Sequence, residues 1–240
     1  MKSFSVTDIG KKRSVNQDYL YCNENAVGKF PNLFIVADGM GGHRAGDYAS
    51  RLCVNKVIEA VEASHMVTPV SIFDEAIEFA NRAVYGEAAD NEEYEGMGTT
   101  FVGAVLYDKT LYVANIGDSR LYVLSDKFHQ ITEDHSLVEE MVKNGEIRKD
   151  EARSHPNKNI ITRALGTGKT VVADYFELEL KEGDIVLLCS DGLTNMVEDE
   201  EIAHILRQYK TELKSAGEKL VMRANEYGGK DNIAIVLVQI

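Results

Sequence analysis

Short runs of residues that favour β-strands recur along this chain, and they constrain its fold more than any other feature. Several of them alternate apolar and polar residues, as antiparallel strands with one buried face do. The chain is therefore expected to form antiparallel sheets. The runs cover residues 4–9, 19–22, 33–37, 100–107, 110–116, 120–124, 175–180, 184–190 and 232–240.

Helical periodicity dominates three other parts of the chain. Residues 45–64 and 71–88 form one pair, residues 136–144 a short helix, and residues 200–227 an interrupted stretch. Only three prolines occur, and no Pro-, Ser- or Gly-rich linker divides the sequence. Strands in runs and helices in pairs favour an α+β fold, with sheets packed together and helices outside. One domain over residues 1–240 is expected.

Composition narrows the classes of partner. The 240 residues carry a formal net charge of −13, so nucleic acid and anionic membranes are disfavoured as partners. The N-terminus lacks the apolar stretch of a signal peptide, and no segment reaches the length of a membrane span. The sequence predicts a cytoplasmic protein.

Aspartates lie at the ends of several predicted strands. Asp38 follows the apolar run 33–37 and precedes Gly39, within the stretch LFIVADGMGGH. The other aspartates in such positions are Asp18, Asp118, Asp191 and Asp231. One such aspartate is usually a turn former. Five are harder to explain in that way, although turns are also where aspartates are common.

Carboxylates held at strand ends could share a purpose. Brought together, they would repel one another and take up protons unless a cation neutralised them. Mg²⁺ and Mn²⁺ prefer oxygen ligands, and two such ions about 3.5–4 Å apart can activate a water for in-line displacement. Glycine beside a ligand lets a backbone carbonyl or a phosphate approach closely.

A basic group lies near the first of these aspartates. Arg13 stands in GKKRSVNQD, ahead of Asp18. Arginine binds phosphate through two parallel hydrogen bonds. By residue type alone, a solvated basic patch with Lys11 and Lys12 is the better explanation.

The ordered set of motifs resembles the metal-dependent protein serine/threonine phosphatases of type 2C, in their compact bacterial form. The matching stretches are RSVNQD, FIVADGMGGH, GTTF, ANIGDSRLY, ITEDHS, ITRALG, LLCSDGL and KDNIAIVLV. They occur in the family's order and span nearly the whole chain. Single motifs such as SDGL are weak signals, whereas the ordered set is specific.

The resemblance implies a sandwich of two antiparallel β-sheets flanked by helix pairs, a four-layer α-β-β-α fold, with metals at one end. Mn²⁺ or Mg²⁺ would form two core sites and a possible third. Asp38 would bridge the core ions, the Gly39 carbonyl would bind the second, and Asp191 and Asp231 would complete the first. Asp18 would hold a water on the metal. Asp118, with Asp191, would match the third-metal site, and Arg13 would bind the substrate phosphate.

Two positions depart from many eukaryotic relatives. Gln17 stands where they have Glu, so one acidic contact to the second metal is lacking. Met40 stands where they have a histidine proposed as general acid, and a thioether cannot donate a proton. His43 could substitute, but a water on the metal is the preferred donor, with His43 as a packing residue.

Two further segments need an explanation. Residues 144–160 are polar and poorly periodic, which predicts a mobile loop or short helical flap. The stretch Asp134, His135, Ser136 could suggest part of a catalytic triad. Triads assemble in space rather than from consecutive residues, so a turn or a helix N-cap is preferred.

The sequence therefore predicts hydrolysis of phosphoserine and phosphothreonine in proteins, by metal-activated water and without a phosphoenzyme. By resemblance, a bacterial Ser/Thr kinase and its targets would be the partners, and the protein would be a monomer. Two alternatives stay open. One is a non-catalytic module that binds metal or phosphopeptide, which retention of the five aspartates and Arg13 disfavours. The other is a phosphotransferase with Asp38 as nucleophile, although the stretch DGM lacks the second aspartate of a DxD motif.

Overall fold

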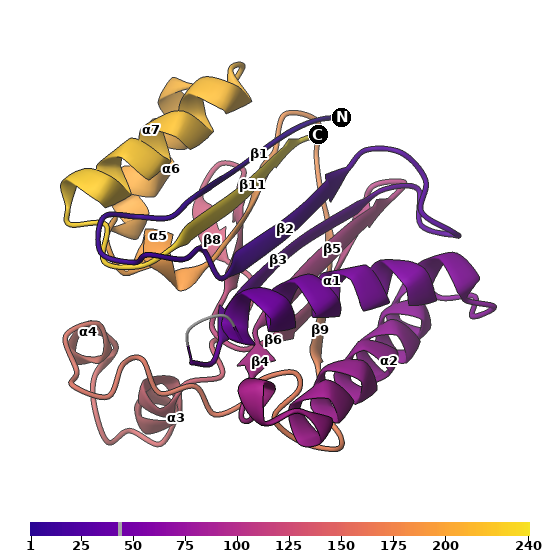
Figure 1. The fold of residues 1–240 in the computed structure, drawn as a ribbon. Coiled ribbons are helices and arrows are strands. Elements are labelled where there is room, and N and C mark those ends of the chain that lie inside the picture. Colours follow the sequence, from indigo (N-terminus) through magenta and orange to yellow (C-terminus); the bar gives the residue numbers. More distant parts are fainter. Residues whose placement is uncertain (43–44) are drawn as a thin grey trace.

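Two antiparallel sheets form the centre of the molecule (Figure 1). The computed structural model describes residues 1–42 and 45–240. In spatial order, the first sheet contains β1 (Lys2–Asp8), β11 (Ile233–Gln239), β10 (Ile185–Cys189), β7 (Arg120–Leu124) and β8 (Phe128–Gln130). The second contains β2 (Asp18–Asn23), β3 (Leu33–Met40), β5 (Phe101–Tyr107), β6 (Thr110–Ile116) and β9 (Asp174–Glu179), and β4 (Gly98–Thr99) pairs with β3.

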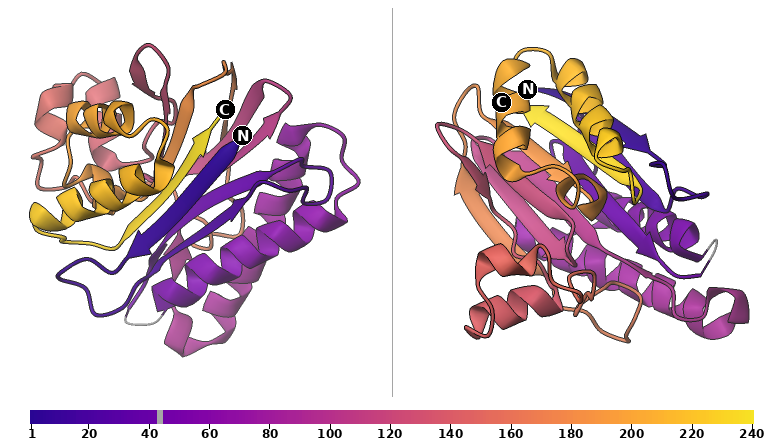
Figure 2. Two further views of the ribbon diagram at one scale, coloured as in Figure 1. Left: turned by 90° about the horizontal axis from the view of Figure 1, so that it is seen from above. Right: turned by 90° about the vertical axis from the view of Figure 1, so that its left-hand side faces the viewer.

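Helices cover the outer faces of both sheets, as two further views also show (Figure 2). The second sheet is covered by α1 (Ala45–Ala63) and α2 (Pro69–Asp90), and the 3-10 turn η1 (Glu92–Tyr94) follows α2. The first sheet is covered by α6 (Asp199–Gln208) and α7 (Leu213–Glu226), with α5 (Asp191–Thr194) directly after β10. The four-layer sandwich expected from the sequence is confirmed.

The burial pattern of the central strands explains why the layers stack. In β3, Phe34 and Val36 pack between the sheets, while Leu33, Ile35 and Ala37 pack under α1 and α2. The strand β11 repeats this alternation, with Ala234, Val236 and Val238 between the sheets and the intervening residues facing helices. Successive side chains of a strand point to opposite faces, so a strand buried on both faces is apolar throughout.

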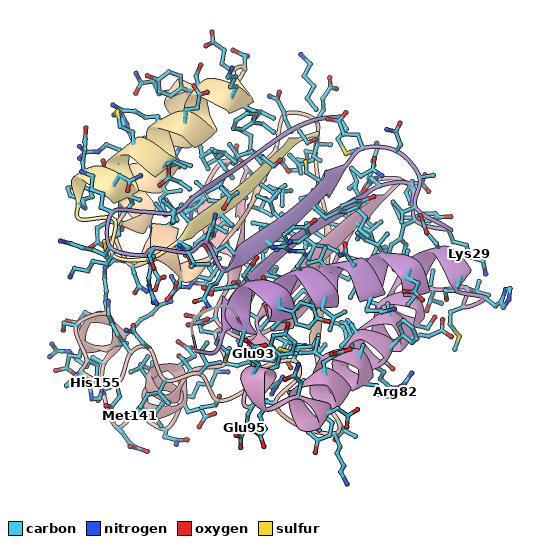
Figure 3. All side chains as sticks on the ribbon, in the orientation of Figure 1. Lys29, Arg82, Glu93, Glu95, Met141 and His155 are labelled. Atoms are coloured by element: carbon cyan, nitrogen blue, oxygen red, sulfur yellow. The ribbon has the colours of Figure 1, made fainter. Side chains whose placement is uncertain are left out.

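Two short helices stand apart from the sandwich. They are α3 (Leu137–Lys143) and α4 (Lys149–Ala152). Met141 and His155 mark this segment in Figure 3, beside the end of the sheets where β3 and β10 finish. Ser136 is the N-cap of α3 and accepts a hydrogen bond from the Glu139 amide, so the predicted N-cap in this stretch is confirmed one residue after His135.

No described helix combines the length and the apolar composition that a bilayer crossing needs.

Candidate metal centre

Asp18 and Asp38 lie opposite each other on neighbouring strands. The register of β2 and β3 pairs the two residues directly. Like charges facing each other across a sheet are destabilising. Asp18 is 6% exposed, and its Oδ2 accepts a hydrogen bond of 2.7 Å from the Ser190 hydroxyl. Its Oδ1 is buried without a hydrogen-bond partner among the described residues.

Asp191 begins α5 directly after β10, beside the turn that leads into β11. A Cβ at Gly192 would lie 1.8 Å from the Asn232 carbonyl oxygen, so only glycine lets the two segments approach this closely. This contact brings Asp191 near Asp231. The Asn195 amide donates to Asp191 Oδ2 at 2.7 Å, while Asp191 Oδ1 is buried and, within the described chain, has no partner.

Gly39 lies where α1 begins against β3. A Cβ at Gly39 would lie 1.9 Å from the Gly46 carbonyl oxygen, which excludes any side chain there. The Gly39 amide donates to the Gln17 carbonyl at 3.0 Å. The glycine next to Asp38 is thus required by close packing of the backbone, and it also holds the position predicted to offer a carbonyl ligand.

Burial and mutual repulsion raise the pKa of these carboxyl groups. Burial, with repulsion from Asp191 and Asp231, raises the pKa of Asp18 to about 7 despite the hydrogen bond from Ser190. Burial, and then Asp231, raises the pKa of Asp191 to about 6. The pKa of Asp38 rises well above its usual value because of burial and then the charge of Asp18. A bound cation would reverse this balance, because it stabilises the ionised carboxylates.

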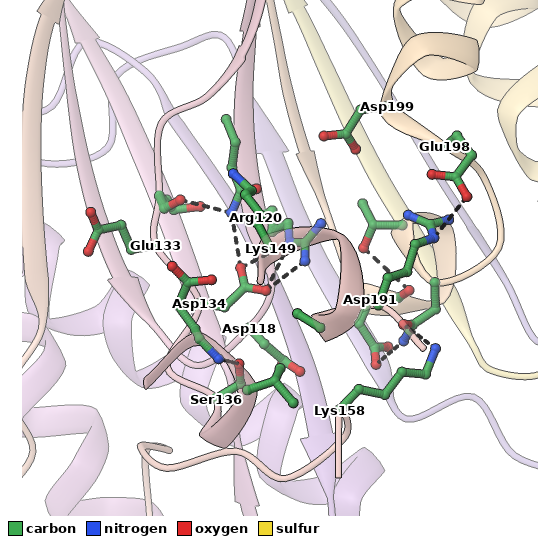
Figure 4. Close-up of a pocket in the computed structure, with 18 of the residues that line it drawn as sticks. Asp118, Arg120, Glu133, Asp134, Ser136, Lys149, Lys158, Asp191, Glu198 and Asp199 are labelled. Atoms are coloured by element: carbon green, nitrogen blue, oxygen red, sulfur yellow. Dashed lines mark hydrogen bonds and ion pairs between the residues drawn. The ribbon is translucent and has the colours of Figure 1, made fainter. Parts of the chain in front are cut away.

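Asp118 occupies the turn between β6 and β7. Gly117 precedes it with φ +99°, and a Cβ there would lie 2.6 Å from Thr100 Cγ2. Asp118 is 7% exposed, and burial, followed by repulsion from Asp191, raises its pKa well above the usual value. Asp118 and Asp191 both line a cleft of about 860 Å³ (Figure 4). The structure thus brings the candidate third-metal residue to the same cleft as a core candidate.

The far wall of this cleft belongs to the flap segment, and α5 with the start of α6 forms another wall. Two contacts join these walls across the cleft: Arg153 pairs with Glu198 at 3.0 Å, and the Lys158 ammonium donates to Asn195 Oδ1 at 3.0 Å. Asn195 in turn donates to Asp191. The flap is therefore linked through one asparagine to a candidate metal ligand.

Arg13 lies at the mouth of the site. Its Nη2 donates to Asp231 Oδ2 at 2.8 Å, and its side chain is 49% exposed. Together with Lys158 and Lys230 it lines a second cavity of about 260 Å³ that also contains Asp191 and Asp231. The three basic side chains would attract an anion there, which the sequence predicted only for Arg13.

Gln17 and Met40, the two residues that differ from many eukaryotic relatives, lie beside the site. The Gln17 amide donates to Asn232 Oδ1 at 2.9 Å, and its side chain donates to the Gly41 carbonyl at 3.4 Å. Met40 ends β3. The suggested role of His43 falls on a residue outside the described ranges.

Sequence reasoning missed several residues that support the site. Ser190 and Asn195 orient the carboxylates of Asp18 and Asp191, and the Asn232 amide holds the loop before β2 by donating to the Ile9 and Val15 carbonyls at 2.9 and 3.0 Å. Their only sequence signal is proximity to a predicted aspartate. Nothing in the sequence marks Lys158, because its contact spans 37 positions.

The residues present fit a divalent cation on chemical grounds. Among the described residues, no three acidic, histidine or cysteine side chains form a closed ligand cluster. The fit rests instead on two buried carboxylate oxygens, those of Asp18 and Asp191, which no other described residue contacts by a hydrogen bond, and on acidic groups that raise one another's pKa. Carboxylates supplemented by a carbonyl and waters are a usual environment for Mg²⁺ or Mn²⁺.

Comparison with known proteins identifies the class. The family model for protein phosphatase 2C matches residues 10–237. The serine/threonine phosphatase stp of Listeria innocua is 43% identical over 238 residues, which cover 97% of this chain and 93% of the relative. The chain belongs to the protein phosphatase 2C family.

Solved structures agree with this assignment. The crystal structure of the serine/threonine phosphatase Stp1 from Staphylococcus aureus superimposes with a TM-score of 0.90 at 36% identity, covering 100% of this chain and 94% of that one. The catalytic domain of the phosphatase PstP in complex with 2 manganese ions gives a TM-score of 0.87 at 32% identity, with 99% and 97% covered. The enzyme class and the divalent-cation dependence predicted from the sequence are therefore confirmed at the level of the family.

Proposed function

We propose that this chain hydrolyses phosphoserine and phosphothreonine in proteins, with Mn²⁺ or Mg²⁺ as cofactor. Asp38, Asp191, Asp231 and the Gly39 carbonyl would hold two core ions, and Asp118 with Asp191 would hold a third. The observation that carries this proposal is a pair of buried carboxylate oxygens, on Asp18 and Asp191, that have no partner among the described residues and lie beside Asp38 among mutually repelling acidic groups.

Each residue then has a distinct task. When bound, the ions would supply activation of a water and neutralisation of charge on the phosphoryl oxygens. Asp18, fixed by Ser190, orients a water rather than binding metal directly. Arg13 exchanges its half-exposed contact with Asp231 for parallel hydrogen bonds to the substrate phosphate.

Direct attack by water, without a phosphoenzyme, is part of the proposal. Asp38 lies directly opposite Asp18 and is repelled by Asp191, so its carboxylate suits a bridging ligand better than an exposed nucleophile. The alternative of a non-catalytic binding module is disfavoured because Arg13 and all five aspartates are present.

The proposal extends to the biological setting. Relatives named as serine/threonine phosphatases come from bacteria, which suggests a bacterial Ser/Thr kinase and its targets as partners. The flap forms one wall of the cleft beside the candidate metal ligands, which suits recognition of a protein substrate. A monomer in the cytoplasm completes the proposal.

One experiment separates the candidate functions. The purified chain is stripped of metal and supplied with MnCl₂, and turnover of p-nitrophenyl phosphate and of a phosphothreonine peptide is measured. The reaction with a peptide whose phosphate is radiolabelled is also quenched with acid, to detect labelled phosphate bound covalently to the protein. Metal-dependent turnover without labelled protein supports the proposal. A covalent phosphoprotein would establish the Asp38 nucleophile, and metal binding without turnover would establish the binding module.

A further inference from the structure

His135 lies buried between the turn that carries Asp118 and the base of the flap. It is 7% exposed and belongs to the segment between β8 and α3. Its amide donates to the Gly117 carbonyl at 2.9 Å, and the Gly117 amide donates back to His135 Nδ1 at 3.0 Å. Its carbonyl accepts from the Thr162 amide at 2.8 Å, where the chain returns from the flap. One residue thus joins the two segments.

The hydrogen bonds of the ring determine its tautomer. Because Nδ1 accepts from the Gly117 amide, the neutral ring carries its proton on Nε2. Nε2 lies 3.1 Å from Asp174 Oδ2, which accepts that proton's hydrogen bond. Arg163 Nη1 lies 3.0 Å from Nε2 but donates to Asp174 Oδ1 at 2.7 Å and to the Val172 carbonyl at 3.0 Å. Asp174 and Arg163 therefore fix the orientation of the imidazole.

The backbone on both sides of Asp118 is pinned. Before it, Gly117 is held by His135. After it, the Ser119 hydroxyl shares a 2.7 Å hydrogen bond with Thr100 Oγ1, which also accepts from the Asp38 amide at 2.9 Å. Among the described residues, no side chain donates a hydrogen bond to the Asp118 carboxylate. Its direction is set by the turn rather than by direct partners.

We propose that His135 is a positioning residue for the third-metal site: its Nδ1 holds the Gly117 amide, so that the turn presents the Asp118 carboxylate to the cleft it shares with Asp191. This inference rests on the role proposed above for Asp118. Residues that orient a ligand from behind commonly affect metal affinity by about 10–100-fold, although they never touch the ion.

Two substitutions at His135 separate this role from packing. In His135→Asn, the amide oxygen takes the place of Nδ1 and keeps an acceptor for Gly117, but it loses Asp174. In His135→Gln, the amide reaches the place of Nε2 and Asp174, but it leaves the Gly117 amide without an acceptor. Neither variant retains the ring, so a pure packing role would affect both equally.

The experiment measures two quantities on the full chain: Mn²⁺ binding by calorimetric titration, and hydrogen exchange of the Gly117 amide by NMR without metal. His135→Asn is expected to bind the third ion within about threefold of the wild-type Kd, with Gly117 still protected. His135→Gln is expected to weaken the third ion by about tenfold or more, and to accelerate exchange at Gly117, while the two core ions stay bound. Equal losses in both variants, or wild-type binding and protection in His135→Gln, would overturn the proposal.

Two further variants keep the test decisive. Should His135→Gln fail to fold, His135→Phe replaces it, because a ring of similar size is kept while the Gly117 amide loses its acceptor. Wild-type affinity for the third ion in that variant would overturn the proposal. Asp118→Ala is the control that should lose the third ion alone. If it keeps that ion, the role proposed for Asp118 fails, while exchange at Gly117 still decides whether His135 holds the turn.

Discussion

At the scale of single residues, the buried acidic side chains are the feature that most needs a physical explanation. A carboxylate removed from water is costly unless it gains a partner or a proton. Asp18 and Asp191 each leave one oxygen without a partner among the described residues, although Ser190 and Asn195 donate to their other oxygens. Hydrogen bonding within the protein therefore satisfies only half of each group, and the other half is suited to a cation or to a water that the cation holds.

Replacing Asp38 with asparagine tests this arrangement. Asp38→Asn keeps the shape but removes a charge that repels Asp18, Asp191, Asp118 and Asp231. Turnover of p-nitrophenyl phosphate is expected to fall by roughly 10²-fold or more, the scale on which transition-state charge stabilisation is lost. The metal-free variant should melt at or above the wild-type temperature, because repulsion is relieved, whereas MnCl₂ should stabilise it less than the wild type. Thermal unfolding with and without MnCl₂ measures both effects.

The exposed Asp126 provides the matched control, because it lies in the turn between β7 and β8, away from the site. Asp126→Asn should leave turnover and Mn²⁺ stabilisation unchanged. Near-normal activity of Asp38→Asn would disprove the bridging role.

Arg13 is expected to recognise phosphate rather than take part in the chemistry. Arg13→Ala should raise KM for phosphate substrates by the equivalent of about 1–3 kcal/mol, the scale of hydrogen bonds to charged groups, with a smaller change in kcat. Its contact with Asp231 is half exposed, so stability should change by less than about 1 kcal/mol. Steady-state kinetics of Arg13→Ala and of the neighbouring Lys12→Ala are the measurement. If the two variants share the wild-type KM, Arg13 belongs to a solvated basic patch instead.

At the scale of elements, the sequence predicted those strands and helices whose apolar residues repeat with a regular period. The nine strand-forming runs and the long helices α1, α2, α6 and α7 are confirmed, because strands and helices each depend on a local periodicity of apolar residues. The short elements β4, β8 and α5 were not predicted. β4 is only two residues long, and α5 is a single turn that begins at Asp191. Such elements exist through tertiary contacts, such as the approach of Asn232 to Gly192, rather than through propensity.

In the candidate site too, features set by local sequence could be predicted and features set by tertiary contacts could not. The aspartates could be found because each stands at the end of a strand, where side chains are held rigidly. The contacts of Lys158 and His135 could not be predicted, because their partners Asn195 and Gly117 lie 37 and 18 positions away in the sequence. Spacing along the chain carries no trace of such contacts.

The flap is the element whose mobility is still a prediction. Residues 144–160 contain only the four-residue helix α4, and no side chain of α4 is buried. Few apolar contacts hold such a segment, so its amide hydrogens should exchange with solvent much faster than those of α7, which should stay protected. Hydrogen exchange followed by mass spectrometry would measure this, and slow exchange across the segment would contradict it.

Substrate dependence tests the flap's function separately. Replacing residues 144–160 with a Gly/Ser linker of equal length should reduce activity on a phosphoprotein more than on p-nitrophenyl phosphate, because only the larger substrate reaches the far wall of the cleft. Equal reductions would show that the segment does not recognise substrate.

At the scale of the whole molecule, the sandwich brings together acidic residues that lie far apart in the sequence. Because the sheets are antiparallel, the start of β2 lies beside the end of β3, and the end of β10 lies beside the start of β11. Packing the two sheets face to face then brings the start of β2, the end of β3, α5 and the turn before β11 to one end of the molecule (Figure 1). These segments carry Asp18, Asp38, Asp191 and Asp231. The fold concentrates repulsion there, and folding becomes linked to whatever relieves it, either protons or cations.

This linkage predicts how the stability of the metal-free protein depends on pH. Asp18 has a pKa of about 7 in the folded protein, against 3.8 as its reference value, and Asp191 has a pKa of about 6. Between about pH 4 and 7, the folded protein therefore holds protons that the unfolded chain has released. Stability from these groups is complete below about pH 4 and is lost as the pH rises toward 7. With EDTA present, the melting temperature should fall over that window.

Divalent cations should oppose the fall, because they stabilise the ionised carboxylates that the folded protein otherwise protonates. MnCl₂ should therefore raise the melting temperature more at pH 7.5 than at pH 5. Asp18→Asn is the matched variant, since the amide oxygen still accepts from Ser190 but cannot titrate. Its metal-free melting temperature should decline less than that of the wild type between pH 5 and 7.5. Parallel curves for the two proteins would show that Asp18 ionises in the folded protein much as it does in the unfolded chain, and that the cost of gathering these charges is met by contacts within the fold rather than by a bound cation.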